Sequence, residues 1–338
     1  MSSIKIPKCP FPNPYKHNIV WNPLWGFKDM DIVGHYIVNK DKTMFKIMLW
    51  EHFNCSYFRG QNKDFPSFLT SLQRLKTPLD RCLAYVQKEE FIDWFLRTPY
   101  YQYFAYNVEL PHDKNTPIGQ GMKFCFDLEA IAQHYEFATN YLDITTKKDI
   151  ALFFAYTYKD QKTDEYKPIE DFNAFQPHLF EVSYNSCLKE PFNPDVRIIG
   201  FQPLRRPILQ YAMGICMDSP KTDYNCEFIK CALPTEKQKA YEIYDKFEGG
   251  KNLFPNDFAS LIAKKIKDRV VKEKIINFDI FLKYCKLNQQ DTKEMENILH
   301  NNGYNFSNEK LLITKDDEIF MQKEIDEVFI PWVDEFVR

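Results

Sequence analysis

Residues 138–156 read ATNYLDITTKKDIALFFAY, and this stretch decides the fold that the sequence predicts. Its first half is compatible with a β-strand. The apolar run IALFFA within its second half predicts a helix that follows at once. Thr145 or Thr146 is a suitable N-cap for that helix, and Asp149 suits its first turn. A strand that passes directly into a helix is the clearest structural signal in the chain.

Short strands and longer helices are expected on both sides of this junction. The segment 55–60, CSYFRG, predicts a buried strand that leaves the core at Arg59 and Gly60. Residues 206–217 are largely apolar and fit either a strand or a helix, and we expect a strand. Helices are expected at 79–96, 127–134, 235–248, 255–274, 278–287, 291–301 and 315–332, and further strands at 177–184 and 196–201. The prediction is an α+β fold, in which a small, strongly bent mixed β-sheet is flanked by helices and followed by a helical C-terminal region.

Proline content marks the first of three regions that we expect along the chain. Prolines at positions 7, 10, 12, 14 and 23 exclude a regular helix there and favour an extended strap, which we expect over residues 1–45. The family resemblance described below implies an α+β domain over residues 46–268 and leaves a helical region over residues 269–338.

Charge and cysteine content limit the classes of function. The formal net charge is −3, which gives no general attraction to nucleic acid or anionic lipid. The nine cysteines include no CxxC pair, so we expect free thiols in a reducing compartment. The sequence contains no HExxH motif that would predict a metal site. It shows no secretion signal, and no uncharged apolar stretch reaches the ~18 residues that span a bilayer. We expect a cytoplasmic protein that binds neither a metal nor a membrane.

Several blocks of residues occur in the order found in one known family. They are Tyr57-Phe58-Arg59-Gly60, Gln133-His134-Tyr135, Thr139 with Leu142-Asp143 and Thr145, Arg206 with Gln210, and Leu253-Phe254-Pro255-Asn256-Asp257-Phe258. Over residues 46–268 the chain therefore resembles the FRG domain family. The chain departs from the family's central block, where Gly, Pro, Arg, Leu and Trp are usual, at Glu136, Ala138, Asn140, Tyr141 and Ile144.

The order of polar residues in these blocks is also similar to that of ADP-ribosyltransferase-like folds, which implies an enzyme with NAD as its substrate. On this interpretation NAD is held by Arg59, which binds the diphosphate, and by Thr139, Thr145 and Arg206. The catalytic residues are His134, Asp143 and Gln210, with Gln210 in the place of a glutamate. Because a glutamine cannot take up a proton as a carboxylate does, Asp143 or His134 would be the base. ADP-ribose would pass to water or to a protein or nucleic-acid acceptor.

Other interpretations use the same residues differently. Arg59, His134 and Arg206 could bind and cleave a phosphodiester, with His134 as general acid or base. The domain could instead be a non-catalytic module that binds a nucleotide or a protein. In a purely structural interpretation, Arg59 pairs with Asp143 in the interior, and Gln210 is a buried amide with satisfied hydrogen bonds.

Overall fold

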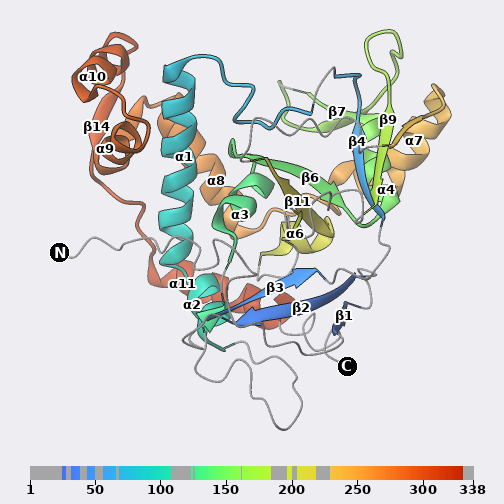
Figure 1. Ribbon diagram of the computed structural model, residues 1–338, viewed down its shortest axis with the longest axis horizontal. Helices are drawn as coiled ribbons and strands as arrows, with labels where there is room; N and C mark the ends of the chain where they lie inside the picture. The colour runs from blue at the N-terminus through green and yellow to red at the C-terminus, as the bar shows by residue number, and fades with distance from the viewer. Residues whose placement is uncertain are drawn as a thin grey trace.

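The computed structural model describes residues 25–27, 32–38, 44–49, 56–65, 68–107, 123–124, 126–160, 162–183, 196–199, 204–217 and 229–329 (Figure 1). Most of the predicted strap over residues 1–45 lies outside these ranges. Two strands of that region, β1 (Trp25–Phe27) and β2 (Ile32–Val38), join β3 (Met44–Leu49) and β5 (Lys123–Phe124) in a four-stranded sheet. In this sheet β3 and β5 run parallel, and the other neighbours are antiparallel.

A second sheet, of six antiparallel strands, forms the centre of the fold. Its order is β10-β11-β6-β4-β9-β12. Pairing between β11 and β6 is continuous, from Ala212 opposite Thr145 to Cys216 opposite Tyr141. Within the described residues, β4 pairs with β6 at Phe58 and Thr145, so the two central strands diverge beyond this point. The strands are β4 (Ser56–Gln61), β6 (Tyr141–Thr145), β9 (His178–Ser183), β10 (Val196–Ile198), β11 (Ala212–Cys216) and β12 (Ile229–Ala232).

The central strand β6 passes directly into α4 (Lys148–Tyr156), as the sequence predicts. The predicted cap is wrong, because the helix begins after Lys147 and has no side-chain cap. The Thr145 hydroxyl instead accepts a hydrogen bond from the Lys147 N–H (3.2 Å) and donates one to the Gln210 carbonyl (2.9 Å). This threonine therefore ties the junction to Gln210, two residues before strand β11.

Helix α4 lies directly against strand β4 at Gly60. A Cβ atom at this position would overlap the carbonyl oxygen of Ala151. Only a glycine lets the two backbones approach so closely. The opposite side of α4 buries Ile150 and Phe153 in an apolar cluster, so the helix is held from both sides.

The largest hydrophobic core joins the central sheet to helices α1, α3 and α8. Aromatic rings fill much of it, and the Phe91 ring lies 5.2 Å from that of Tyr135 and 5.4 Å from that of Trp94. Thr77 caps α1 by accepting a hydrogen bond from the Asp80 N–H at 3.0 Å. These helices are α1 (Pro78–Leu96), α3 (Leu128–His134) and α8 (Phe258–Val271), with α2 (Pro99–Asn107) following α1.

Helices α9 and α10 pack on α1, on the far side from α4, whereas α11 packs on α2 (Figure 1). A separate core that includes Cys82, Phe281 and Cys285 joins α1 to α9 (Phe278–Leu287) and α10 (Thr292–Asn301). The remaining elements are β7 (Thr157–Lys159), β8 (Tyr166–Pro168), α6 (Arg205–Leu209), α7 (Lys237–Lys246), η3 (Glu248–Gly250), β13 (Ile275–Asn277), β14 (Asn305–Ser307), α11 (Lys315–Glu324) and η4 (Ile325–Phe329).

The predicted α+β class, with a sheet flanked by helices, is confirmed. The mixed pairing occurs in the four-stranded sheet, whereas the central sheet is antiparallel. The strand expected over residues 206–217 is wrong in its first half, which forms α6. Tyr211 then takes a left-handed φ of 47° and turns the chain into β11.

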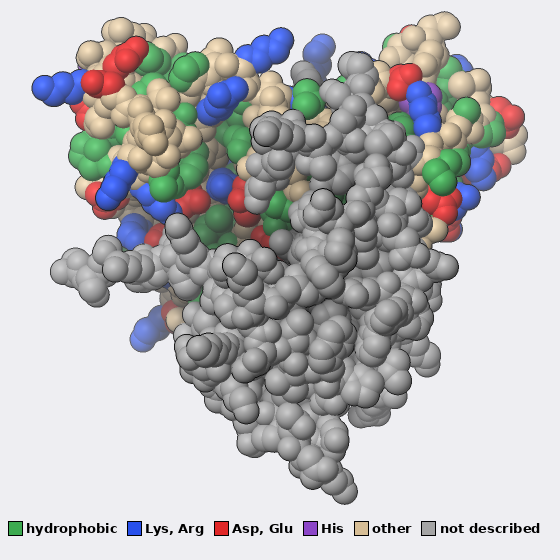
Figure 2. All heavy atoms as spheres, viewed as in Figure 1, with side chains coloured by type: hydrophobic (Ala, Val, Ile, Leu, Met, Phe, Trp, Pro, Cys, Tyr) green, Lys and Arg blue, Asp and Glu red, His purple; other side chains and the backbone are tan. Residues whose placement is uncertain are grey.

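Two further observations concern the length of the described helices and the distribution of charge on the surface. Over this part of the chain, no helix combines the length and the apolar character that crossing a bilayer requires. On the face that Figure 2 shows, the described acidic and basic side chains are interspersed rather than gathered into patches of one sign.

Candidate functional site

A cavity of about 560 Å³ opens where β4 and β6 diverge, and we call it the β4–β6 cleft. Its volume lies within the range of pockets that hold small-molecule ligands. The cleft combines an apolar wall with a few converging polar groups. Its apolar lining includes Phe58, Phe65, Leu69, Ile150, Phe154, Tyr158 and Tyr166, and its polar lining includes Arg59, Gln61, Arg74, His134, Asp143, Thr145, Lys159 and Gln210.

His134 ends α3 and is held in one orientation by Gln210. The Gln210 amide nitrogen donates to the Leu253 carbonyl at 3.0 Å, so its amide oxygen must face the His134 ring, 3.0 Å from Nδ1. Nδ1 is therefore the protonated nitrogen, which donates to Gln210. The opposite nitrogen, Nε2, lies 3.7 Å from Oδ1 of Asp143.

The protonation state of His134 follows from its burial, since its exposed fraction is 7%. Burial lowers the pKa of His134, an effect that Asp143 and Gln210 oppose without reversing it. The ring is therefore neutral at neutral pH, and Nε2 carries a lone pair. A neutral imidazole in this orientation can accept a proton at Nε2.

A second amide, from Gln133, orients Asp143. Its nitrogen donates to Asp143 Oδ2 at 3.0 Å, and its oxygen accepts from the hydroxyls of Thr139 and Ser71. Each hydroxyl also accepts a backbone N–H, from Tyr141 and Thr139 respectively, so its proton is available for Gln133. The carboxylate thus keeps Oδ2 engaged and turns Oδ1 toward His134.

Arg59 reaches the site from β4, opposite Asp143. Its Nη1 donates to the backbone carbonyl of Asp143 at 2.6 Å, rather than to the carboxylate. Burial lowers the pKa of the Arg59 guanidinium, and the nearby Asp143 charge partly offsets this effect. The guanidinium remains charged, because the ordinary pKa of arginine is far above neutrality. A half-buried guanidinium that donates to a carbonyl retains most of its capacity for an anionic ligand.

Three buried polar atoms of these side chains have no hydrogen-bond partner within the described ranges. They are Nε of Arg59, Nε2 of His134 and Oδ1 of Asp143. Buried polar atoms rarely lack a hydrogen-bond partner in the protein unless a water or a ligand provides one. Two acceptors and one cationic donor fit a ligand that has hydroxyl groups and an anionic group.

Arg206 and Thr139, both predicted to bind NAD, do not line the cleft and instead support residues that do. Nη1 of Arg206 donates to the His134 carbonyl at 2.9 Å, and its guanidinium lies over the rings of Tyr135 and Phe254 at 5.1 and 5.2 Å. Thr139 is buried beneath Gln133. The structure thus brings together Arg59, His134, Asp143, Thr145 and Gln210, and their catalytic or binding roles stay predictions.

Sequence reasoning assigned no role to four residues of the site. Gln133 orients Asp143, and its position beside His134 was the available signal. Arg74, Lys159 and Tyr166 line the cleft. Arg74 belongs to a stretch after Gly60 that resembles the family, whereas nothing in the local sequence of Lys159 and Tyr166 marks them. Within the described residues, no group of three His, Cys, Asp or Glu side chains is placed to hold a metal ion.

Comparison with known proteins identifies one domain family. The family model of the FRG domain matches residues 54–164, which include β4, α1, α3, β6 and α4. Neither the curated proteins nor the solved structures gave a match. The chain therefore contains an FRG domain, and Arg59, His134 and Asp143 lie within it.

Proposed function

We propose that this FRG domain binds NAD in the β4–β6 cleft and cleaves the bond between nicotinamide and ribose. The observation that carries the proposal is the set of unpartnered atoms on Arg59, His134 and Asp143 at one cavity. A ribose hydroxyl can donate to Oδ1 of Asp143, which leaves Nε2 of His134 for the hydroxyl of the acceptor. A diphosphate presents oxygens to the Arg59 guanidinium.

The chemistry assigns a separate task to each residue. The bond between ribose C1 and nicotinamide nitrogen breaks, and its electron pair leaves with nicotinamide. The Asp143 carboxylate stabilises the positive charge that develops on the ribose. An acceptor hydroxyl or a water then bonds to C1 and gives its proton to Nε2 of His134. The products are nicotinamide and an ADP-ribosylated acceptor, or free ADP-ribose when water is the acceptor.

On this mechanism Gln210 is a positioning residue, because both ends of its amide are engaged by His134 and Leu253. The acceptor, when it is not water, is a protein or nucleic-acid nucleophile. We further propose that the reaction takes place in the cytosol, because Cys82 and Cys285 are buried thiols without a disulfide.

Nicotinamide release from NAD tests the proposal. We expect Asp143→Asn to lower turnover at least ~100-fold, since one electrostatic contact to the transition state is worth that much. Asp245→Asn, which removes the same charge from α7, leaves turnover unchanged. Arg59→Met weakens NAD binding in calorimetry. Absence of both heat and nicotinamide with the folded wild-type protein would contradict the proposal.

Phosphodiester cleavage is a second candidate, favoured by the neutral Nε2 of His134 in the same cleft as Arg59. The two reactions release different products from NAD. Glycosidic cleavage yields nicotinamide, whereas phosphodiester chemistry yields AMP and nicotinamide mononucleotide. Saturable binding without any product would identify a nucleotide-binding module.

A further inference from the structure

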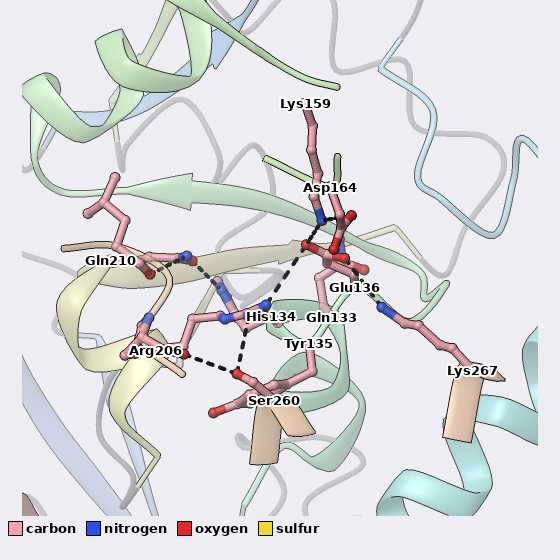
Figure 3. Close-up of polar contacts among 12 residues, drawn as sticks. Gln133, His134, Tyr135, Glu136, Lys159, Asp164, Arg206, Gln210, Ser260 and Lys267 are labelled. Carbon is pink, nitrogen blue, oxygen red and sulfur yellow. Dashed lines mark hydrogen bonds and ion pairs between the residues drawn. The ribbon is translucent and has the colours of Figure 1, made fainter. Parts of the chain in front are cut away.

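Glu136 lies next to the cleft, at the centre of three cationic side chains (Figure 3). Its Oε1 lies 2.7 Å from Nζ of Lys159 and 4.0 Å from Nη1 of Arg206, and its Oε2 lies 3.3 Å from Nζ of Lys267. The three cations come from β7, α6 and α8. We call Lys159, Arg206 and Lys267 the cation cluster.

The cation cluster carries more positive charge than its carboxylates neutralise. Besides Glu136, Asp164 also contacts the cluster. Its Oδ1 lies 2.9 Å from Nζ of Lys159, and its side chain is 83% exposed. The described groups in ion-pair contact therefore sum to three positive and two negative charges, so that without Glu136 three cations would face one carboxylate. Asp143 acts on the same region but makes no ion pair with the cluster within the described residues. Nε of Arg206 is buried and has no partner within the described ranges.

The ionisation of the cluster agrees with this excess. Although burial opposes the effect, Lys267 and Lys159 lower the pKa of Glu136 to about 2. Burial lowers the pKa of Lys267 in spite of its contact with Glu136. Tyr166 also lies close to Glu136 and Arg206, as do Asp143 and Asp164, and burial raises the pKa of Tyr166, so it stays uncharged. An additional anion would therefore be attracted to the cluster.

The backbone at Glu136 is held in an unfavourable conformation. Its φ is 65°, in the left-handed region that side chains other than glycine rarely adopt. The side chain is 41% exposed, so it can move away into solvent without breaking the core. Because rotation of the side chain leaves φ unchanged, it is this exposure, and not the backbone strain, that lets the carboxylate be displaced from the three cations.

The cation cluster is continuous with the cleft. Lys159 and Tyr166 both line the cleft, and Tyr166 lies within electrostatic range of Asp143 as well as Glu136. Arg206 donates to the backbone carbonyl of His134. An anion bound to the cluster would therefore lie beside the candidate catalytic pair.

We propose that Lys159, Arg206 and Lys267 form a binding subsite for a phosphate group, and that the Glu136 carboxylate occupies this subsite until a phosphate displaces it. Glu136 thus acts as an internal competitor that weakens the binding of phosphate-bearing ligands. The subsite goes beyond the proposed reaction, because it requires only an anion and neither NAD nor turnover. The phosphate is either that of free pyrophosphate or that of a nucleotide in the cleft.

Calorimetric titration with inorganic pyrophosphate tests the subsite. Glu136→Gln keeps the size of the side chain and removes its charge. We expect it to bind pyrophosphate about ten-fold more tightly than the wild type, because the phosphate no longer has to displace the Glu136 carboxylate from its contacts with the three cations. Glu136→Gly adds relief of the left-handed strain and should show the same gain with an unimpaired fold.

Two control variants separate the subsite from a general change in charge. Glu242→Gln removes an exposed carboxylate from α7 and should leave pyrophosphate affinity unchanged. Lys267→Met, added to Glu136→Gln, keeps an unbranched side chain but removes the ammonium group, which lies over Phe137 at 5.2 Å, and should abolish the gain. An affinity that is equal in wild type and Glu136→Gln would overturn the proposal, as would a gain that survives Lys267→Met.

A competition experiment with Glu136→Gln identifies the source of the phosphate. If ADP-ribose displaces pyrophosphate, the subsite holds a phosphate of the cleft ligand. If both bind together, the subsite holds free phosphate or pyrophosphate. Failure of NAD cleavage would leave the pyrophosphate result intact, so the two proposals are tested separately.

Discussion

Gly60→Ala should be the most damaging single-methyl change in the central sheet. Gly60 does not have a positive φ, so its backbone conformation suits alanine. The lack of space for a Cβ atom is therefore what opposes the substitution. The added Cβ would overlap the Ala151 carbonyl oxygen and lie 2.7 Å from its carbonyl carbon, 0.7 Å short of an ordinary 3.4 Å contact. No side-chain rotation relieves a clash with backbone, so α4 must move. We expect a loss of about 3 kcal/mol, at the upper end of the cost of overpacking.

Urea unfolding followed by circular dichroism measures this loss. Gly303→Ala is a matched control, because Gly303 has a φ of 81° and its added Cβ would meet nothing within 4 Å. The control should lose about 1 kcal/mol from backbone strain alone. If Gly60→Ala costs no more than Gly303→Ala, the contact between β4 and α4 does not have the role we assign to it.

Three further predictions follow from buried polar groups. Gln210→Met removes two buried hydrogen bonds, so we expect the free energy of unfolding to fall by about 3 kcal/mol. NMR should then show both tautomers of His134. A fall below about 1 kcal/mol would contradict this prediction. Burial raises the pKa of Glu90 from 4.5 to about 7, so the unfolded state ionises first and stability falls as the pH rises between these values. Urea titrations across this range should show a smaller fall for Glu90→Gln, and equal slopes would count against the assignment. Asp257→Ala removes a buried N-cap that accepts three hydrogen bonds, and we expect it to lower the free energy of unfolding by about 3 kcal/mol. Asp291→Ala, which removes an exposed N-cap, should lower it by about 1 kcal/mol. Equal losses in the two variants would contradict this prediction.

The order of elements and much of the candidate site could be predicted from the sequence. The strand that ends at Arg59-Gly60 and the junction of β6 with α4 are encoded in short stretches of apolar and β-branched residues. Such patterns are local, so they need no knowledge of the rest of the chain. The segment 206–217 could not be divided correctly, because its apolar run fits both periods and the left-handed turn at Tyr211 has no sequence signal.

The sequence by itself determined the α+β class and which polar residues, Arg59, His134 and Asp143 among them, were candidates for a site. Only the tertiary structure decided what these residues do to one another. Gln210 bonds His134 across 76 positions of sequence, and Lys267 bonds Glu136 across 131. Such pairings depend on how the sheet and helices pack, since no local pattern records a partner that far away. The physical reason is that periodicity specifies the face that a residue occupies, whereas packing alone specifies what faces it.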